Sequence, residues 1–140
     1  MRKIAIVYWS GTGNTEAMAN AVYNGLKAAG AEAELLQVID TDAKTVLLYD
    51  TLLMGCPAMG AEALEEEDFE PFFAELEGKL NGKRVGLFGS YGWGDGEWMR
   101  SWQERTEAAG AVVIGSVIAN DSPDDKAVAQ CEELGKKAAS

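Results

Sequence analysis

Short apolar segments alternate with segments of helical periodicity along the chain, and this alternation constrains the fold more than any other feature. The apolar runs have the length and continuity of strands that are covered on both faces of a sheet. The segments between them repeat their apolar residues every three to four positions, as amphipathic helices do. The expected strands cover residues 4–8, 33–38, 50–55, 84–89 and 112–118, and the expected helices cover 14–29, 41–48, 69–77, 97–109 and 122–138.

A strand and helix alternation of this kind predicts an α/β fold, a doubly wound parallel sheet with helices on both faces. Ligands of such sheets bind beyond the carboxyl ends of the strands, where the direction of winding switches. The loops after the first, third and fourth expected strands should therefore form the functional site. At 140 residues the chain has the size of one domain, so we expect residues 1–140 to form a single domain.

The charge and the rare residue types exclude several functions. Acidic residues number 23 and basic residues 12, for a net charge of −11, so we expect neither nucleic acid nor an anionic membrane as a partner. Two cysteines without a CxxC spacing and no histidine argue against a zinc, haem or iron–sulfur site and exclude a histidine-dependent triad. Redox chemistry would therefore need an organic cofactor. No apolar run approaches the ~20 residues of a membrane span, and the first run is too short for a signal peptide, so we expect a cytoplasmic protein.

The loop after the first expected strand, Ser10-Gly11-Thr12-Gly13-Asn14-Thr15, has the composition of a phosphate cradle. Its glycines allow a tight turn with inward N–H groups, and the helix that follows adds a positive dipole end. It lacks the lysine of the nucleoside triphosphate loop, and Glu16 replaces the third glycine of the dinucleotide fingerprint. A neutral, hydroxyl-rich cup suits one terminal monophosphate. The alternative is an ordinary turn whose polar side chains only cap the helix.

This loop resembles the phosphate loop of the flavodoxin family, [ST]-x-T-G-x-T, and with Trp9 and Glu16 it is most similar to short-chain flavodoxins of anaerobic bacteria. The resemblance implies a flavodoxin-like five-stranded sheet of order 2-1-3-4-5 with FMN at the switch between strands one and three, the familiar flavodoxin arrangement. It further implies a flavoprotein of electron transport and not an enzyme. Such a carrier binds one FMN non-covalently and cycles between semiquinone and hydroquinone at low potential, shuttling single electrons between redox enzymes.

The loop after the third expected strand contains Ala58, Met59, Gly60 and Glu62. Met59 offers a soft apolar surface for an aromatic ring, and Gly60 permits backbone angles that are closed to other residues. By the resemblance, the Met59-Gly60 peptide flips when the flavin takes up one electron, and Glu62 accepts a hydrogen bond from flavin N3. Pro57 stands where some relatives carry serine and is not an expected contact. The alternative is a generic loop with a chance methionine.

The loop after the fourth expected strand, Ser90-Tyr91-Gly92-Trp93-Gly94, places aromatic residues among glycines. Exposed aromatics in such a loop are costly unless a flat partner covers them, and stacking adds about 0.5–1.5 kcal/mol beyond buried area. The resemblance implies that Trp93 stacks on the outer face of the flavin and that neighbouring N–H groups reach its pyrimidine edge. The alternative is that Tyr91 and Trp93 pack onto the protein's own helices. Trp98 and Trp102 lie one helical turn apart, which favours a place in the core.

Carboxylates surround these loops at Glu62, Asp95, Glu97 and residues 65–68. Several of them could supply about 1.4 kcal/mol against an anionic hydroquinone, or about 59 mV for one electron. For the run 65–68, a solvated helix start is an equal alternative. We expect a monomer whose acidity either keeps it in solution or steers it to basic docking patches of flavodoxin- or ferredoxin-type reductases and other oxidoreductases.

Three other functions are alternatives to an electron carrier. An FMN-dependent NAD(P)H:quinone reductase usually needs a longer chain for its second substrate. A flavin-free signalling receiver needs an aspartate after strand three, where this chain has Cys56-Pro57, and a tyrosine phosphatase needs an arginine where Glu62 stands.

Overall fold

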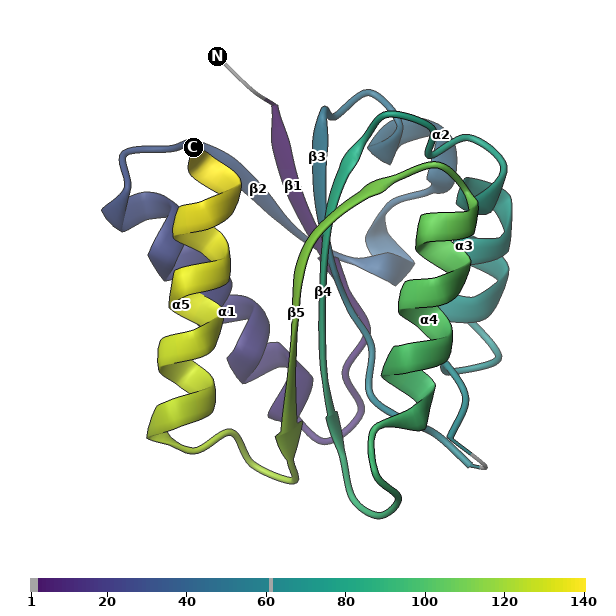
Figure 1. The fold of residues 1–140 in the computed structure, drawn as a ribbon, viewed down its shortest axis with the longest axis vertical. Coiled ribbons are helices and arrows are strands. Elements are labelled where there is room, and N and C mark those ends of the chain that lie inside the picture. Colours follow the sequence, from purple (N-terminus) through teal and green to yellow (C-terminus); the bar gives the residue numbers. More distant parts are fainter. Residues whose placement is uncertain (1–2, 61) are drawn as a thin grey trace.

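Five parallel strands form one sheet in the computed structural model of the chain, which describes residues 3–60 and 62–140. Met1, Arg2 and the loop residue Ala61 lie outside the described residues. The order across the sheet is β2-β1-β3-β4-β5, which confirms the flavodoxin-like α/β fold (Figure 1). The strands are β1 (Ile4–Tyr8), β2 (Ala33–Gln37), β3 (Thr51–Gly55), β4 (Arg84–Tyr91) and β5 (Val112–Asn120).

Helices cover both faces of the sheet (Figure 1). One face carries α1 (Asn14–Ala28) and α5 (Asp125–Ala139). The other carries α2 (Ala43–Val46), α3 (Phe69–Glu77) and α4 (Glu97–Ala108), and a short 3₁₀ turn, η1 (Val38–Asp40), follows β2. Alternate residues of the central strands enter the two apolar layers, because successive side chains of a strand point to opposite faces. In the described part of the chain, no helix is both long and apolar enough to cross a membrane.

Two different kinds of packing hold the helices. Between α3 and α4, the indole of Trp102 meets the rings of Phe69 and Phe73 edge-on, with centroids 5.4 and 6.0 Å apart. Between α1 and α5, the backbones approach closely at Gly25 and Gly135, where an added Cβ would collide with the facing helix's carbonyl oxygen. The sheet therefore lies between an aromatic layer and a layer of close helix contact.

The structure differs from the predicted elements at several ends, and β5 extends to Asn120 and not to residue 118. β4 extends to Tyr91 and not to Gly89, because its last residues still pair with Ala119 and Asn120 of β5. The predicted helix at 41–48 is only the four residues of α2.

The predicted cap of the last helix is also wrong. Asp124 caps α5, and its side chain accepts a hydrogen bond from Ala127 N–H at 2.8 Å. Ser122 and Pro123 instead connect the sheet to α5. They cannot begin the helix because Asp121 N–H still donates to the carbonyl of Tyr91, at 2.7 Å.

Candidate functional site

The loops that follow β1, β3 and β4 meet at one edge of the sheet and enclose a pocket of about 220 Å³. This edge lies at the bottom of Figure 1 and is formed by the carboxyl ends of the strands. Ten of the expected site residues line the pocket: Ser10, Gly11, Thr12, Asn14, Thr15, Ala58, Met59, Ser90, Tyr91 and Gly92. The expected residues Gly13, Gly60, Glu62, Trp93 and Gly94 do not line it. A wider depression lies at the opposite ends of the strands, beside Lys3 and Tyr49, and contains none of these loops.

The first loop turns into α1 through Gly13, which adopts the left-handed conformation with φ +96°. The hydroxyl oxygen of Ser10 accepts hydrogen bonds from the N–H groups of Gly13 (3.1 Å) and Glu16 (3.2 Å). No acceptor among residues 3–60 and 62–140 takes the hydroxyl proton of Ser10, so a ligand could accept it. The first N–H groups of α1 have no intrahelical acceptor and add the positive end of the helix dipole. The turn can therefore receive an anion without any cationic side chain.

Thr15 and Ser90 join the first loop to the end of β4. Their hydroxyl oxygens lie 3.3 Å apart, and Ser90 N–H donates to the Thr15 hydroxyl at 3.4 Å. Both side chains are buried, with exposures of 1% and 5%. This contact closes the floor of the pocket, where the two loops meet.

The loop after β3 folds back on itself between Met59 and Ala63. Each donates its N–H to the carbonyl of the other, at 2.8 and 2.9 Å. Gly60 and Glu62 both have positive φ, +53° and +52°. The glycine tolerates this conformation, whereas for glutamate it costs about 1–2 kcal/mol. The backbone of Glu62 is therefore strained.

Trp93 lies at the outer end of the site with 69% of its surface exposed. Gly94, beside it, has φ +91°, and a Cβ built on it would collide with the carboxylate of Glu62, so the loops after β3 and β4 approach each other closely here. Tyr91, in contrast, is half-buried and packs on Trp98 with ring centroids 5.6 Å apart. Trp98 and Trp102 are buried, as predicted.

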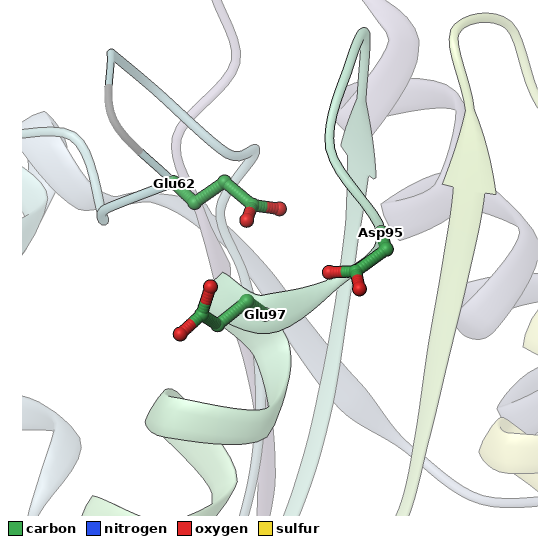
Figure 2. Close-up of side chains that lie close together, drawn as sticks. All are labelled: Glu62, Asp95 and Glu97. Atoms are coloured by element: carbon green, nitrogen blue, oxygen red, sulfur yellow. The ribbon is translucent and has the colours of Figure 1, made fainter.

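Three carboxylates gather at this outer end, from Glu62, Asp95 and Glu97 (Figure 2). One oxygen of each lies within 4.8 Å of the others. Asp95 pairs with Arg100 at 3.0 Å, but both side chains are exposed. Oε1 of Glu62 is shielded from solvent and has no hydrogen-bond partner among the described residues. Such an acceptor fits an N–H donor of a ligand, because a buried carboxylate oxygen without a partner is costly.

Three pocket residues were not among the expected contacts: Trp9, Pro57 and Asp121. The ring of Trp9 lies 3.0 Å from the point where a Cβ of Gly11 would sit, so it forms a wall of the first loop. Its Nε1 donates to Asp68 at 3.4 Å. Position directly after β1 was the available signal for Trp9, and position after β5 was the signal for Asp121.

Tyr8 and Cys56, which end β1 and follow β3, are poorly suited to acid–base or nucleophilic chemistry. The hydroxyl of Tyr8 donates to Glu16 at 2.9 Å, and burial together with this bond raises the pKa of Tyr8 to about 12. Burial likewise raises the pKa of the Cys56 thiol well above its ordinary value. Neither group ionises near neutral pH, and the chain has no histidine.

The fold and this site together define a doubly wound α/β protein with its ligand site at the winding switch. A neutral, glycine-rich turn lies at the carboxyl end of β1, and aromatic and carboxylate groups lie beyond β3 and β4. Comparison with known proteins gives the family. The sequence pattern of flavodoxins matches residues 6–135.

Two flavodoxins are similar over almost the whole chain. That of Megasphaera elsdenii is 57% identical over 136 residues, covering 97% of this chain and 98% of the relative. That of Clostridium beijerinckii is 48% identical over 134 residues, covering 96% and 97%. The solution structure of the two-electron reduced M. elsdenii flavodoxin superimposes with a TM-score of 0.90 over 97% of this chain and 98% of that one. The chain belongs to the flavodoxin family, whose members are flavin-binding electron-transfer proteins.

Proposed function

We propose that this protein binds one FMN non-covalently and carries single electrons between redox enzymes. When bound, FMN supplies the one-electron chemistry, between semiquinone and hydroquinone. The observation that carries the proposal is a combination of three features at one sheet edge: a neutral anion cup, an exposed tryptophan, and a shielded carboxylate oxygen that has no partner among the described residues.

The first loop would hold the phosphate. Backbone N–H groups at the start of α1, the free hydroxyl proton of Ser10 and the hydroxyl of Thr12 all lie at the pocket. Gly13 turns the chain so that these groups converge. A pocket of about 220 Å³ is smaller than the ~300–1,000 Å³ of usual ligand sites, which suits the phosphate and its chain with the ring lying further out. The proposed contacts are Ser10, Gly11, Thr12, Gly13, Asn14 and Thr15.

The second and third loops would hold the ring. Trp93 and Met59 expose apolar surface at 69% and 39%, which a flat aromatic ligand would cover. Oε1 of Glu62 would accept a hydrogen bond from a ring N–H, and Gly60 leaves the Met59-Gly60 peptide free to adopt either orientation. The remaining proposed contacts are Ala58, Ser90, Tyr91, Gly92 and Gly94.

The carboxylates of Glu62, Asp95 and Glu97 would tune the potential, since they disfavour added negative charge beside them (Figure 2). The same charges would attract basic docking patches on reductases and oxidoreductases. We propose a cytoplasmic monomer of one domain that is a carrier and not an enzyme.

Titration with FMN tests the proposal. The wild-type protein should turn yellow, bind one FMN per chain and become blue at half reduction. Trp93→Ala should weaken FMN binding about tenfold, whereas Leu48→Ala should not, because Leu48 is equally exposed but lies at the opposite sheet edge.

Two outcomes contradict the proposal. If the protein stays colourless after FMN is added, it does not bind this cofactor and the proposal is wrong. Rapid steady-state reduction of a quinone by NADPH with this protein alone would make it an enzyme.

A further inference from the structure

The buried carboxylate of Glu65 takes no part in the function proposed above. Only 6% of the residue is exposed. Its two oxygens accept three backbone hydrogen bonds, from the N–H groups of Glu67 (2.9 Å), Asp68 (2.8 Å) and Phe69 (2.9 Å). No cationic side chain pairs with it within the described residues. The charge is therefore stabilised entirely by backbone N–H groups, an arrangement that requires the chain to be held around it.

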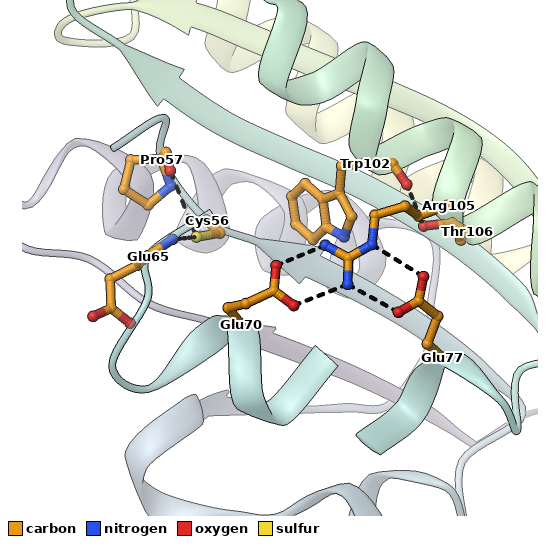
Figure 3. A network of polar contacts seen from close by, with 8 residues as sticks. All are labelled: Cys56, Pro57, Glu65, Glu70, Glu77, Trp102, Arg105 and Thr106. Atoms are coloured by element: carbon orange, nitrogen blue, oxygen red, sulfur yellow. Dashed lines mark hydrogen bonds and ion pairs between the residues drawn. The ribbon is translucent and has the colours of Figure 1, made fainter. Parts of the chain in front are cut away.

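The backbone of Glu65 closes the loop that begins at Cys56. Its N–H donates to the Cys56 sulfur at 3.4 Å (Figure 3), and its carbonyl accepts from Glu70 N–H at 2.8 Å. The other end of the loop is fixed to the sheet and to α4, since Cys56 N–H donates to Phe88 O at 3.1 Å and Trp98 Nε1 donates to Cys56 O at 3.2 Å. Both ends of the segment 56–65 thus meet at one anchored point.

Between these ends the loop carries the groups proposed to meet the flavin ring. Met59 and Ala63 form its narrow inner bridge, and Glu62 keeps its strained backbone there. Any shift of Glu65 relative to Cys56 would change the width of the loop base. Such a shift would move the carbonyl of Met59 and the carboxylate of Glu62 together.

We infer that Glu65 is a positioning residue, whose carboxylate locks the base of loop 56–65 and thereby sets the affinity for FMN and its one-electron potentials. The inference rests on the proposed function. The plainer alternative is that Glu65 only caps α3, because the three N–H groups stand at the start of that helix. A helix cap would affect stability and leave the potentials unchanged.

Glu65→Asp separates these alternatives without changing the net charge. The side chain at position 65 becomes one methylene shorter. The backbone around it must therefore move closer for the carboxylate to reach the same N–H groups. Glu66→Asp is the matched control, since Glu66 is the next residue in the chain, is exposed and accepts none of these bonds. The measurements are the dissociation constant for FMN, the two midpoint potentials of the loaded protein, and its melting temperature.

We expect E65D to bind FMN at least tenfold more weakly than E66D, or to change the relative affinity for two oxidation states tenfold, which is about 59 mV for one electron. Equal affinities and potentials in E65D and E66D would overturn the inference, even if E65D melted at a lower temperature. If E65D does not fold, Glu65→Gln and Glu66→Gln form the corresponding pair. Their affinities for FMN and their midpoint potentials are compared in the same way.

The same measurements distinguish failure of the inference from failure of the proposed function. If the wild-type protein binds no FMN, the proposed function is wrong. If the wild-type protein binds FMN and cycles it, but E65D is indistinguishable from E66D, only the role inferred for Glu65 is wrong.

Discussion

Glycines near the site are required for two different physical reasons. At Gly13 φ is +96°, and a Cβ would meet nothing within 4 Å, so the requirement is conformational. At Gly89 φ is not in the left-handed region, but a Cβ would collide with the carbonyl oxygen of Cys56. Alanine at Gly13 therefore tests the backbone of the phosphate loop without a steric clash.

Gly13→Ala should weaken FMN binding about tenfold, because a side chain in the left-handed region costs about 1–2 kcal/mol and will pull the turn away from this shape. Riboflavin, which lacks the phosphate, should bind equally to both proteins. Fluorescence titrations with the two ligands measure this difference. An equal loss for FMN and riboflavin would show that the loop does not hold the phosphate.

Both cysteines should be inert in the folded protein. Cys56 and Cys131 have no exposed surface, and burial raises the pKa of both thiols, that of Cys131 to about 12. The thiolate is the reactive form, so a disulfide reagent at pH 8 should label neither residue within an hour. In guanidinium chloride it should label two thiols per chain. Labelling of one thiol under native conditions would contradict the burial described here.

At the scale of elements, α1 and α5 depend on a close backbone contact at Gly25 and Gly135. Alanine is the better helix former by about 1 kcal/mol, so propensity alone predicts that Ala would stabilise either helix. The collision with the facing carbonyl predicts the reverse.

Gly25→Ala and Gly135→Ala should each lower the free energy of unfolding by about 1–3 kcal/mol, since the helices must separate to admit the methyl group. Gly78→Ala is the control, because Gly78 ends α3 at an ordinary φ of −81° with open space around it, and it should be nearly neutral. Urea unfolding curves give the three values. Stabilisation by Gly25→Ala would show that the helices lie further apart.

Arg105 joins α3 to α4 by two bidentate contacts (Figure 3). Its guanidinium lies 2.7 Å from Glu70 and 2.9 Å from Glu77, and it also lies over the ring of Phe73. The hydrogen bonds from Arg105 lower the pKa of Glu77 below its ordinary value of 4.5. The link therefore stabilises the fold above about pH 4.5 and is lost as pH falls through the lower, folded-state pKa.

Glu77→Gln should reduce the free energy of unfolding at pH 7 by less than about 1 kcal/mol, because the pair is partly exposed. The variant should lose less stability than the wild type between pH 6 and pH 3, since it lacks the titrating group. Unfolding curves at several pH values measure both effects. Parallel pH profiles would mean that the contact does not form in solution.

At the scale of the whole molecule, the net charge of −11 should govern encounters with other proteins. Electron transfer from the reduced protein to cytochrome c, a basic redox protein, should slow several-fold between about 50 and 300 mM salt, because screening shortens the reach of opposite charges. Stopped-flow absorbance measures the rate. A rate independent of salt would exclude electrostatic steering.

Much of the fold was predictable because a parallel sheet buried on both faces requires continuous apolar runs. β1 and β3 are such runs, and every residue in them is buried. The ends of the elements were less predictable. Ser90 and Tyr91 extend β4 through backbone pairing with β5, which side-chain patterns do not record. The cap at Asp124 and not Ser122 likewise depends on where β5 releases the chain.

The three loops of the site were predictable, because all three follow strands at one edge and are unusual in composition. Trp9 was named only for its part in the family resemblance and not as a contact, because the sequence does not show that its ring lies against Gly11. Asp121 was missed because only the folded sheet brings the end of β5 beside Gly92, where its carboxylate lies 3.5 Å from a Cβ built on that glycine. The contacts that each loop makes with FMN stay predictions.

Arg84, at the start of β4, holds the last turn of α5 through the carbonyls of Lys137, Ala138 and Ser140. The chain therefore finishes at the edge of the sheet opposite the pocket, near the top of Figure 1. A linker attached after Ser140 would immobilise the molecule on an electrode with Trp93 facing the solution. Fusion to a partner at this position should likewise leave the approach to Met59 and Trp93 unobstructed.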